Sequence, residues 1–197
     1  MIQFDQLKAV REYCHHLFHQ DASGHDFFHL SRVARIAGEI AEEEGADSFI
    51  CIVGAWLHDV GDYKLFSDTE KALNDMDQFL DSIGLTNKQI LAIHEAIENV
   101  SFSKGNIPET LEGKIIQDAD RIDAIGAIGI ARTFAYGGAS GNLMYHDTAK
   151  AGTSVQHFYD KILRLKDLLH TSAAKRLAQS RHQFVEDYLE QFFKEWG

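Results

Sequence analysis

The feature that most constrains the fold is an apolar segment, residues 49–57, that ends directly in His58 and Asp59. Nearly every side chain in this segment is apolar, which predicts a helix packed on most of its sides. An imidazole and a carboxylate at the end of such a helix are removed from water. A buried carboxylate is strongly destabilising unless a partner compensates it, so we expect a cation or hydrogen-bond donors opposite Asp59. A metal ion is one candidate.

The rest of the chain also carries a helical pattern. Apolar residues recur at intervals of three and four, and the 197 residues include a single proline, Pro108. Proline breaks helix interiors, so its scarcity suits a helical protein. We therefore predict an all-α fold of about seven to nine helices. The expected helices cover, in approximate bounds, residues 4–18, 30–44, 47–58, 69–83, 87–101, 110–134, 155–169 and 177–192.

Local signals predict where some of these helices begin. Residues 67–70 and 86–89 have the form of capping boxes, with Ser or Thr followed three residues later by Glu or Gln. Residues 135–152 are rich in glycine and have no sustained period, which predicts a loop or a lid. The chain is long enough for one compact domain, and 45% of its residues are hydrophobic. We expect a single domain over 1–197, with a core at about 20–135 and C-terminal helices at about 150–196 packed on it.

Charge and composition exclude several classes of function. The formal net charge of -11 and the pI near 5.4 disfavour a surface for nucleic acid duplexes, although a local cationic pocket could still bind a small phosphate. The first residues lack a signal-peptide pattern and no apolar run is long enough for a membrane span, so we expect a cytoplasmic protein without a membrane partner. Cys14 and Cys51 lie at apolar helical positions and are expected to be buried, reduced thiols.

Further polar residues could meet His58 and Asp59 in space. His25 and His29 are four residues apart at the start of the second expected helix, the spacing that places two side chains on one face. The expected helix over residues 110–134 carries three acids, Asp118, Asp120 and Asp123. These acids repel one another unless a counter-charge is present. A site of imidazole and carboxylate ligands without thiolate suits Mn, Mg, Fe, Co or Ni, and also Zn. It is less typical of a structural zinc site.

These residues also have interpretations that need no metal. His29 could be a hydrogen-bonded core histidine, and His25 could cap a helix. Asp120 could pair with Arg121 or Arg132. The residues alone leave both interpretations open.

His29, the pair His58 and Asp59, and Asp120 occur in the order of the H...HD...D pattern, and in this the chain resembles the HD-domain superfamily of metal-dependent phosphohydrolases. Longer stretches resemble its YpgQ/YedJ-like bacterial branch. They are GHDFFHLSRVARIA, WLHDVGDYK, SFS, QDADRIDAIGAIGIARTFAYGG and RHQFVEDYLEQFFKEW, and the similarity runs from about residue 20 to the end.

The resemblance implies an HD-type helical bundle that binds one divalent ion through His29, His58, Asp59 and Asp120. Mn or Mg is expected first, with Co, Ni, Fe or Zn as alternatives. It implies hydrolysis of a small phosphorylated substrate, a nucleotide, in the manner of a nucleoside triphosphate pyrophosphohydrolase. A phosphomonoesterase such as a 5'-nucleotidase, a cyclic-nucleotide phosphodiesterase, and a nucleotide-sensing module without turnover are the alternatives.

The same motifs supply further candidate residues. Asp62 occupies a position where other superfamily members carry a proton-transferring acid, and His25 is a second candidate for proton transfer, although Asp62 could instead belong to a turn and His25 could orient His29. Asp118 and Asp123 are expected to support the site or pair helices without binding the metal. The candidates for binding the substrate are Lys64, Lys104, Arg121, Arg132, Tyr136 and His146.

Overall fold

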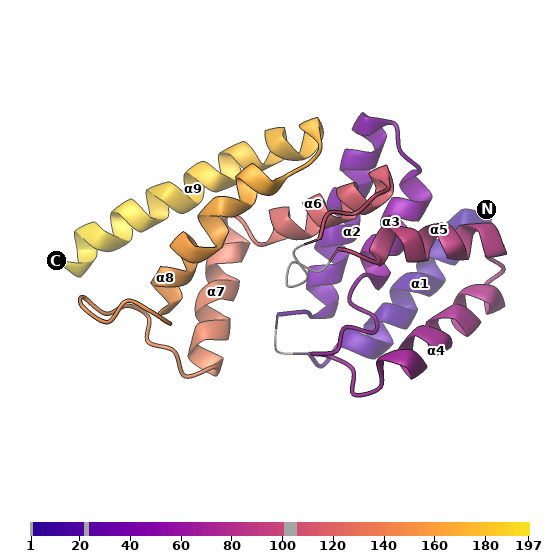
Figure 1. Ribbon diagram of the computed structural model, residues 1–197, viewed down its shortest axis with the longest axis horizontal. Coiled ribbons are helices and arrows are strands. Elements are labelled where there is room, and N and C mark those ends of the chain that lie inside the picture. The colour runs from indigo at the N-terminus through magenta and orange to yellow at the C-terminus, as the bar shows by residue number, and fades with distance from the viewer. Residues whose placement is uncertain (1, 22–23, 101–105) are drawn as a thin grey trace. The chain divides into compact units, whose positions relative to one another are not determined.

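The protein is all-α in the part of the chain that the structure describes. The computed structural model describes residues 2–21, 24–100 and 106–197, and within them it has nine α-helices, one 3-10 helix and no strand (Figure 1). The α-helices are α1 (Ile2–Phe18), α2 (Phe27–Glu44), α3 (Ser48–Leu57), α4 (Thr69–Ser82), α5 (Asn87–Ile97), α6 (Leu111–Asp123), α7 (Ala127–Ala139), α8 (Ser154–Asp160) and α9 (Ser172–Trp196), and the 3-10 helix is η2 (Ile162–Leu168). The predicted fold class and helix number are confirmed.

The chain divides into two compact units, Met1–Ala119 and Asp120–Gly197. In the first unit α3 is the central helix and contacts α1, α2 and α5 (Figure 1). In the second unit α7 packs against α8 and α9, and η2 packs against α8 and α9. The expectation of a single domain stays a prediction.

The central helix α3 is buried because its sequence has almost no polar face. Of its ten residues, eight are buried, as the apolar segment predicts. Its first turn is capped by Asp47, whose side chain accepts hydrogen bonds from the backbone N–H groups of Phe49 (3.0 Å) and Ile50 (3.1 Å). The helix therefore begins at a fixed point and ends at Leu57, with His58 as its C-cap.

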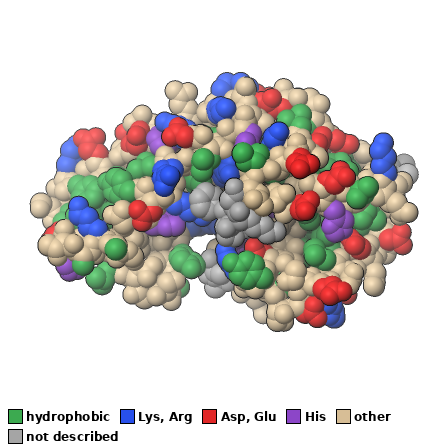
Figure 2. Space-filling model, viewed as in Figure 1, with side chains coloured by type: hydrophobic (Ala, Val, Ile, Leu, Met, Phe, Trp, Pro, Cys, Tyr) green, Lys and Arg blue, Asp and Glu red, His purple; other side chains and the backbone are tan. Residues whose placement is uncertain are grey.

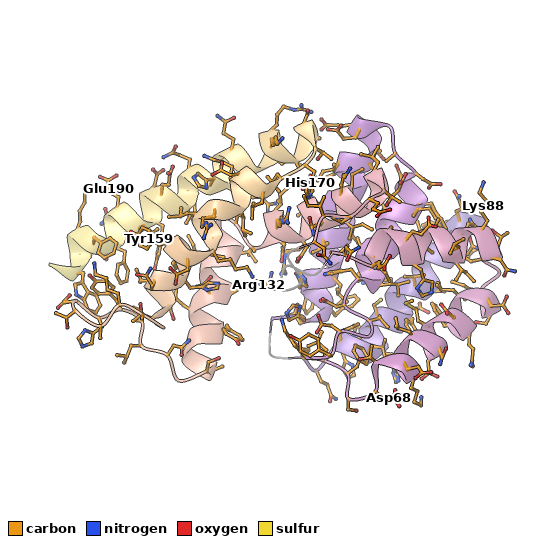
Figure 3. The ribbon with its side chains drawn as sticks, in the orientation of Figure 1. Asp68, Lys88, Arg132, Tyr159, His170 and Glu190 are labelled. Carbon is orange, nitrogen blue, oxygen red and sulfur yellow. The ribbon has the colours of Figure 1, made fainter. Side chains whose placement is uncertain are left out.

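The sequence predicted a capping box at the start of α4 and another at the start of α5, and the structure has only the second. The Thr86 and Gln89 capping box at the start of α5 is confirmed. At α4 the predicted capping box is wrong, because Asp68 (labelled in Figure 3) caps the helix by accepting from the backbone N–H of Lys71 at 2.9 Å. An aspartate placed one residue later than the expected serine performs the same function.

The predicted long helix over residues 110–134 is wrong, since α6 ends at Asp123 and α7 begins at Ala127. The break lies at Gly126, whose φ of 90° and ψ of -161° are accessible almost only to glycine. The apolar pattern continues on both sides of the break, so periodicity alone does not reveal it.

Two other predicted boundaries in the second unit are corrected. The helix expected over 155–169 is divided at Lys161 (φ -133°) into α8 and η2. The glycine-rich segment 135–152 is helical up to Ala139, where α7 ends, and forms turns from Ser140 onward. The fifth helix ends at Ile97, before the expected residue 101, which lies outside the described residues.

Aromatic side chains supply much of the packing in the second unit. Phe134 of α7 lies 6.1 Å from Tyr188 and 6.4 Å from Phe192 of α9, between ring centroids. Tyr145 packs edge-on against Trp196 at 5.0 Å. These contacts attach the turns after α7 to the C-terminal helix.

Charged side chains of both signs are interspersed on the face drawn in Figure 2. Among the described residues, no helix combines the length and the apolar character that crossing a membrane requires.

A buried glutamine connects α6 to the segment before it. Nε2 of Gln117, a residue with 1% exposure, approaches the backbone carbonyls of Asn99 (2.9 Å), Val100 (3.3 Å) and Asn106 (3.1 Å). One side chain therefore satisfies backbone acceptors at both ends of the segment 99–106.

We expect Gln117→Leu to lower the free energy of unfolding by about 1–3 kcal/mol, because leucine removes the donor of these three carbonyls, and the contact with Val100 is buried. Urea denaturation followed by circular dichroism measures the change. The matched control is Gln191→Leu on the exposed face of α9, which should change stability by about 0.5 kcal/mol or less. Equal stability of the two variants would contradict the role of Gln117.

Both cysteines are free and fully buried, as predicted. Sγ of Cys14 donates to the carbonyl oxygen of Trp56 at 3.2 Å, and burial raises the pKa of both thiols, that of Cys51 to about 12.

We expect neither thiol to react with Ellman's reagent at about pH 8 in the native protein and both to react in urea, because the reactive species is the exposed thiolate. Fast reaction of one thiol in the native state would contradict this burial.

Candidate metal centre

Three imidazoles surround the carboxylate of Asp59 in the first unit. Its Oδ2 lies 2.9 Å from Nδ1 of His25 and 3.8 Å from Nε2 of His29. Its Oδ1 lies 3.5 Å from Nε2 of His58. The ring of His29 is 5.6 Å from that of His58 and 5.7 Å from that of His25, between centroids. The sequence elements that were expected to meet, the start of the second helix and the end of the third, therefore do meet.

The start of α2 fixes the position of His29. Asp26 is the N-cap of this helix, and its Oδ1 accepts a hydrogen bond from the backbone N–H of His29 at 2.7 Å. His29 is therefore in the first turn of the helix, and its side chain is completely buried. A capping residue thus places the imidazole beside Asp59.

The end of α3 fixes the ring of His58 and which of its nitrogens donates a hydrogen bond. Nδ1 of His58 lies 2.8 Å from the carbonyl oxygen of Ala55, one turn earlier. A carbonyl oxygen can only accept, so Nδ1 carries the proton and the neutral ring has its lone pair on Nε2, the nitrogen that faces Asp59. A hydrogen bond of this kind, from the non-ligating nitrogen to a carbonyl, is typical of histidines that bind metals.

The electrostatics of the cluster favour an ionised carboxylate. Burial by itself raises the pKa of Asp59, but the charge of His58, the hydrogen bond from His25 and the charges of His25 and His29 outweigh burial and lower the pKa well below its usual range. Asp59 is therefore an anion at neutral pH, and three imidazoles surround it.

The donor atoms fit a divalent metal ion. A lone pair on Nε2 of His58 and an anionic oxygen 3.5 Å away repel each other unless a proton or a cation lies between them. Single donor atoms of His25, His29 and Asp59 also lie within 4.8 Å of one another. Nitrogen and oxygen donors without thiolate are the set that Mn, Mg, Fe, Co and Ni share, as the sequence indicates.

A turn after α3 carries Asp62 and Lys64. Gly61 has φ of 80°, a conformation that glycine adopts readily, and the backbone N–H of Asp62 donates to the carbonyl of Asp59 at 3.2 Å. Oδ1 of Asp62 accepts from the backbone N–H of Lys64 at 2.8 Å, so this aspartate does stabilise the turn. Nζ of Lys64 lies 5.5 Å from the ring centroid of Tyr63, and both side chains are exposed. The proton-transfer role of Asp62 stays a prediction.

The remaining acids lie on α6. Asp118 is fully buried in the first unit, and Asp120 is the first residue of the second unit and is half-buried. Asp123 is buried, and its Oδ2 accepts from Nη1 of Arg132 at 2.6 Å. Asp123 therefore pairs α6 with α7, and the predicted roles of Asp118 and Asp123 in supporting the metal site stay predictions.

The predicted substrate-binding residues belong to both units of the chain. In the second unit, Arg121 is buried and donates to the carbonyl of Leu168, while Arg132 extends from α7 (Figure 3). Tyr136 is 59% exposed on α7, and Nδ1 of His146 accepts from the backbone N–H of Ala149 at 3.0 Å. Lys104 lies outside the described residues. Their contacts with a substrate stay predictions.

Sequence reasoning missed two residues beside the site, Asp26 and Asp21, and one buried residue of α6, Gln117. Asp26 precedes the apolar period of α2, a position at which an N-cap signal is readable. Asp21 accepts from the backbone N–H of His25 at 3.2 Å, and Gln117 fixes the segment before α6. No pattern in the sequence indicates these last two contacts, because each joins residues through tertiary structure or an irregular turn.

Comparison with known proteins identifies relatives along the whole chain. The model of the HD domain matches residues 27–125. YpgQ of Bacillus subtilis is 37% identical over 99% of this chain and 96% of its own length. The crystal structure of that protein in complex with ADP has a TM-score of 0.86 at 37% identity, covering 99% of this chain and 97% of the other. An HD-superfamily hydrolase from Bacillus thuringiensis has a TM-score of 0.83 at 41% identity, covering 98% of each chain.

We expect Asp59→Asn to destabilise the metal-free protein at about pH 5, because the neutral amide cannot replace the ionised carboxylate whose pKa the surrounding imidazoles lower. A group with a lowered pKa stabilises the fold fully above its unfolded pKa of about 3.9, and that stabilisation is lost as the pH falls toward the folded value. The stability gap between wild type and variant should therefore narrow below about pH 4. Urea denaturation in EDTA measures it, with Asp81→Asn on exposed α4 as control. A gap independent of pH would contradict the electrostatic account.

Proposed function

This chain belongs to the HD domain family, and from that premise we propose that it is a divalent-metal-dependent phosphohydrolase that cleaves nucleoside triphosphates to a monophosphate and pyrophosphate. The observation that carries the proposal is the cluster of His25, His29 and His58 around the ionised Asp59. The fold is that of the HD-superfamily hydrolases.

We assign the metal ligands to His29, His58, Asp59 and Asp120. The first three lie together in the first unit, and Nε2 of His58 is prepared to coordinate by the hydrogen bond at Nδ1. Asp120 completes the H...HD...D order of the sequence. Its neighbour Asp123 is a weaker candidate, because its carboxylate is already bonded to Arg132.

A bound divalent ion would acidify a water molecule and polarise the phosphoryl group for in-line attack. Asp62 is our candidate for the residue that removes or returns the proton. Oδ1 of Asp62 accepts a hydrogen bond from the backbone N–H of Lys64 at 2.8 Å. This bond fixes the orientation of the Asp62 carboxylate, three residues beyond Asp59. A carboxylate in a fixed orientation next to the ligands suits general acid or base catalysis.

The assignment of a nucleotide as substrate rests on the likeness to YpgQ, whose crystal structure contains ADP. Phosphate groups require cations, and the candidates are Lys64, Lys104, Arg121 and Arg132. Lys64 is the exposed cation closest in sequence to the metal ligands, two residues after Asp62. Tyr136 and His146 are candidates for contacts with the base or the sugar.

We expect the purified protein to release pyrophosphate and a nucleoside monophosphate when nucleoside triphosphates are supplied with Mn, Mg, Co or Ni. His58→Ala should lower the rate at least about 100-fold and lower the metal content, because an inner ligand is lost. Chromatographic separation of products across a panel of nucleotides and phosphate esters measures the reaction, and elemental analysis measures the metal.

The products separate this proposal from its alternatives. Orthophosphate from monophosphates would indicate a 5'-nucleotidase, and opening of a cyclic nucleotide would indicate a phosphodiesterase. Nucleotide binding without turnover at any metal would indicate a sensing module. Equal metal content in wild type and His58→Ala would contradict the metal centre itself.

A further inference from the structure

His25 contacts the candidate metal centre without occupying a position of the H...HD...D pattern. Its Nδ1 lies 2.9 Å from Oδ2 of Asp59, which makes this the shortest of the three imidazole contacts of that carboxylate. A carboxylate oxygen only accepts, so the proton lies on Nδ1 of His25 and the ring donates to Asp59. A nitrogen that carries this proton has no lone pair for a metal ion, so in this arrangement Nδ1 does not act as a ligand atom.

The backbone holds the donating ring in place. Oδ1 of Asp21 accepts from the N–H of His25 at 3.2 Å, and the next residue, Asp26, is the N-cap of α2. The imidazole packs edge-on against His29, with ring planes at 90° and centroids 5.7 Å apart. The side chain of His25 is 41% exposed, whereas that of His29 is fully buried. His25 therefore lies at the solvent side of the cluster, in an orientation fixed by three neighbours.

A carboxylate can rotate about its Cβ–Cγ bond, which exchanges its two oxygens between their partners. The hydrogen bond from His25 to Oδ2 opposes that rotation, and Oδ1 then stays turned toward Nε2 of His58 at 3.5 Å. Hydrogen bonds to ligating carboxylates set their orientation, and loss of such a bond typically weakens metal binding about 10- to 100-fold.

We propose that His25 is a positioning residue that holds the carboxylate of Asp59 in the orientation that binds the metal ion. This inference rests on the proposed function, because it requires that Asp59 is a ligand. It assigns His25 a role through Asp59 and not on the substrate, in place of the proton transfer that the sequence also allows.

The test compares two substitutions that differ in one hydrogen-bond donor. His25→Asn places an amide N–H close to the position of Nδ1 and should keep the bond to Asp59, while His25→Leu removes the donor and fills a similar volume. His16→Leu, which removes an exposed histidine from α1, is the matched control for loss of a surface imidazole. The probe is Mn²⁺ alone, titrated into each full-length protein, with free Mn²⁺ measured by electron paramagnetic resonance.

We expect His25→Leu to raise the dissociation constant for Mn²⁺ about 10- to 100-fold, and His25→Asn and His16→Leu to stay within about threefold of wild type. Turnover of a nucleoside triphosphate by His25→Leu should recover toward the wild-type rate at saturating Mn²⁺, because a positioning residue acts only through the ligand. Thermal unfolding monitored by circular dichroism checks that the variants are folded.

Three outcomes would overturn the inference, each in a distinguishable way. Wild-type affinity in His25→Leu, with wild type binding one Mn²⁺, would exclude the positioning role and leave the metal centre intact. A low rate of His25→Leu that saturating Mn²⁺ does not restore, with unchanged affinity, would assign His25 to proton transfer. No Mn²⁺ binding by wild type would refute the proposed function together with the inference.

Discussion

The structure depends on the burial of one anionic side chain, the carboxylate of Asp59, at the end of an apolar helix. Taking a carboxylate out of water is unfavourable, and α3 is buried on most sides, so the surrounding elements must supply compensating groups. They do so with His58 from α3, His29 from α2 and His25 from the turn before α2. Packing of α2 on α3 is therefore inseparable from assembly of the site.

Most of the fold was predictable from the sequence because the helices bury one face, and burial of one face imposes a period on the apolar residues. The exceptions share a physical cause. At Gly126 and Lys161 the chain changes direction through backbone dihedrals, while the apolar pattern continues across the change. At Asp68 the sequence offered several residues able to cap, and the local φ and ψ decided which one does. Periodicity records which side chains are buried, not where the backbone turns.

The cluster around Asp59 was predictable in its residue types and only partly in its contacts. The burial expected for His58 and Asp59 follows from the apolar helix that precedes them, and both are buried at the side-chain level. The hydrogen bonds from His25 to Asp59 and from His58 to Ala55 depend on side-chain torsions and on the approach of two helices. A linear sequence does not encode these quantities directly, so only the folded structure shows which partner each of the three imidazoles contacts.

Gln117 gives the first unit a property that bears on how such proteins diversify. Its side chain donates toward the carbonyls of Asn99, Val100 and Asn106, and so it attaches these three residues to α6 through backbone atoms alone. Backbone carbonyls are present whatever side chains the segment carries. Substitutions at Asn99 and Asn106 can therefore accumulate during evolution without removing the acceptors that attach this part of the chain to α6, the helix that carries the acids.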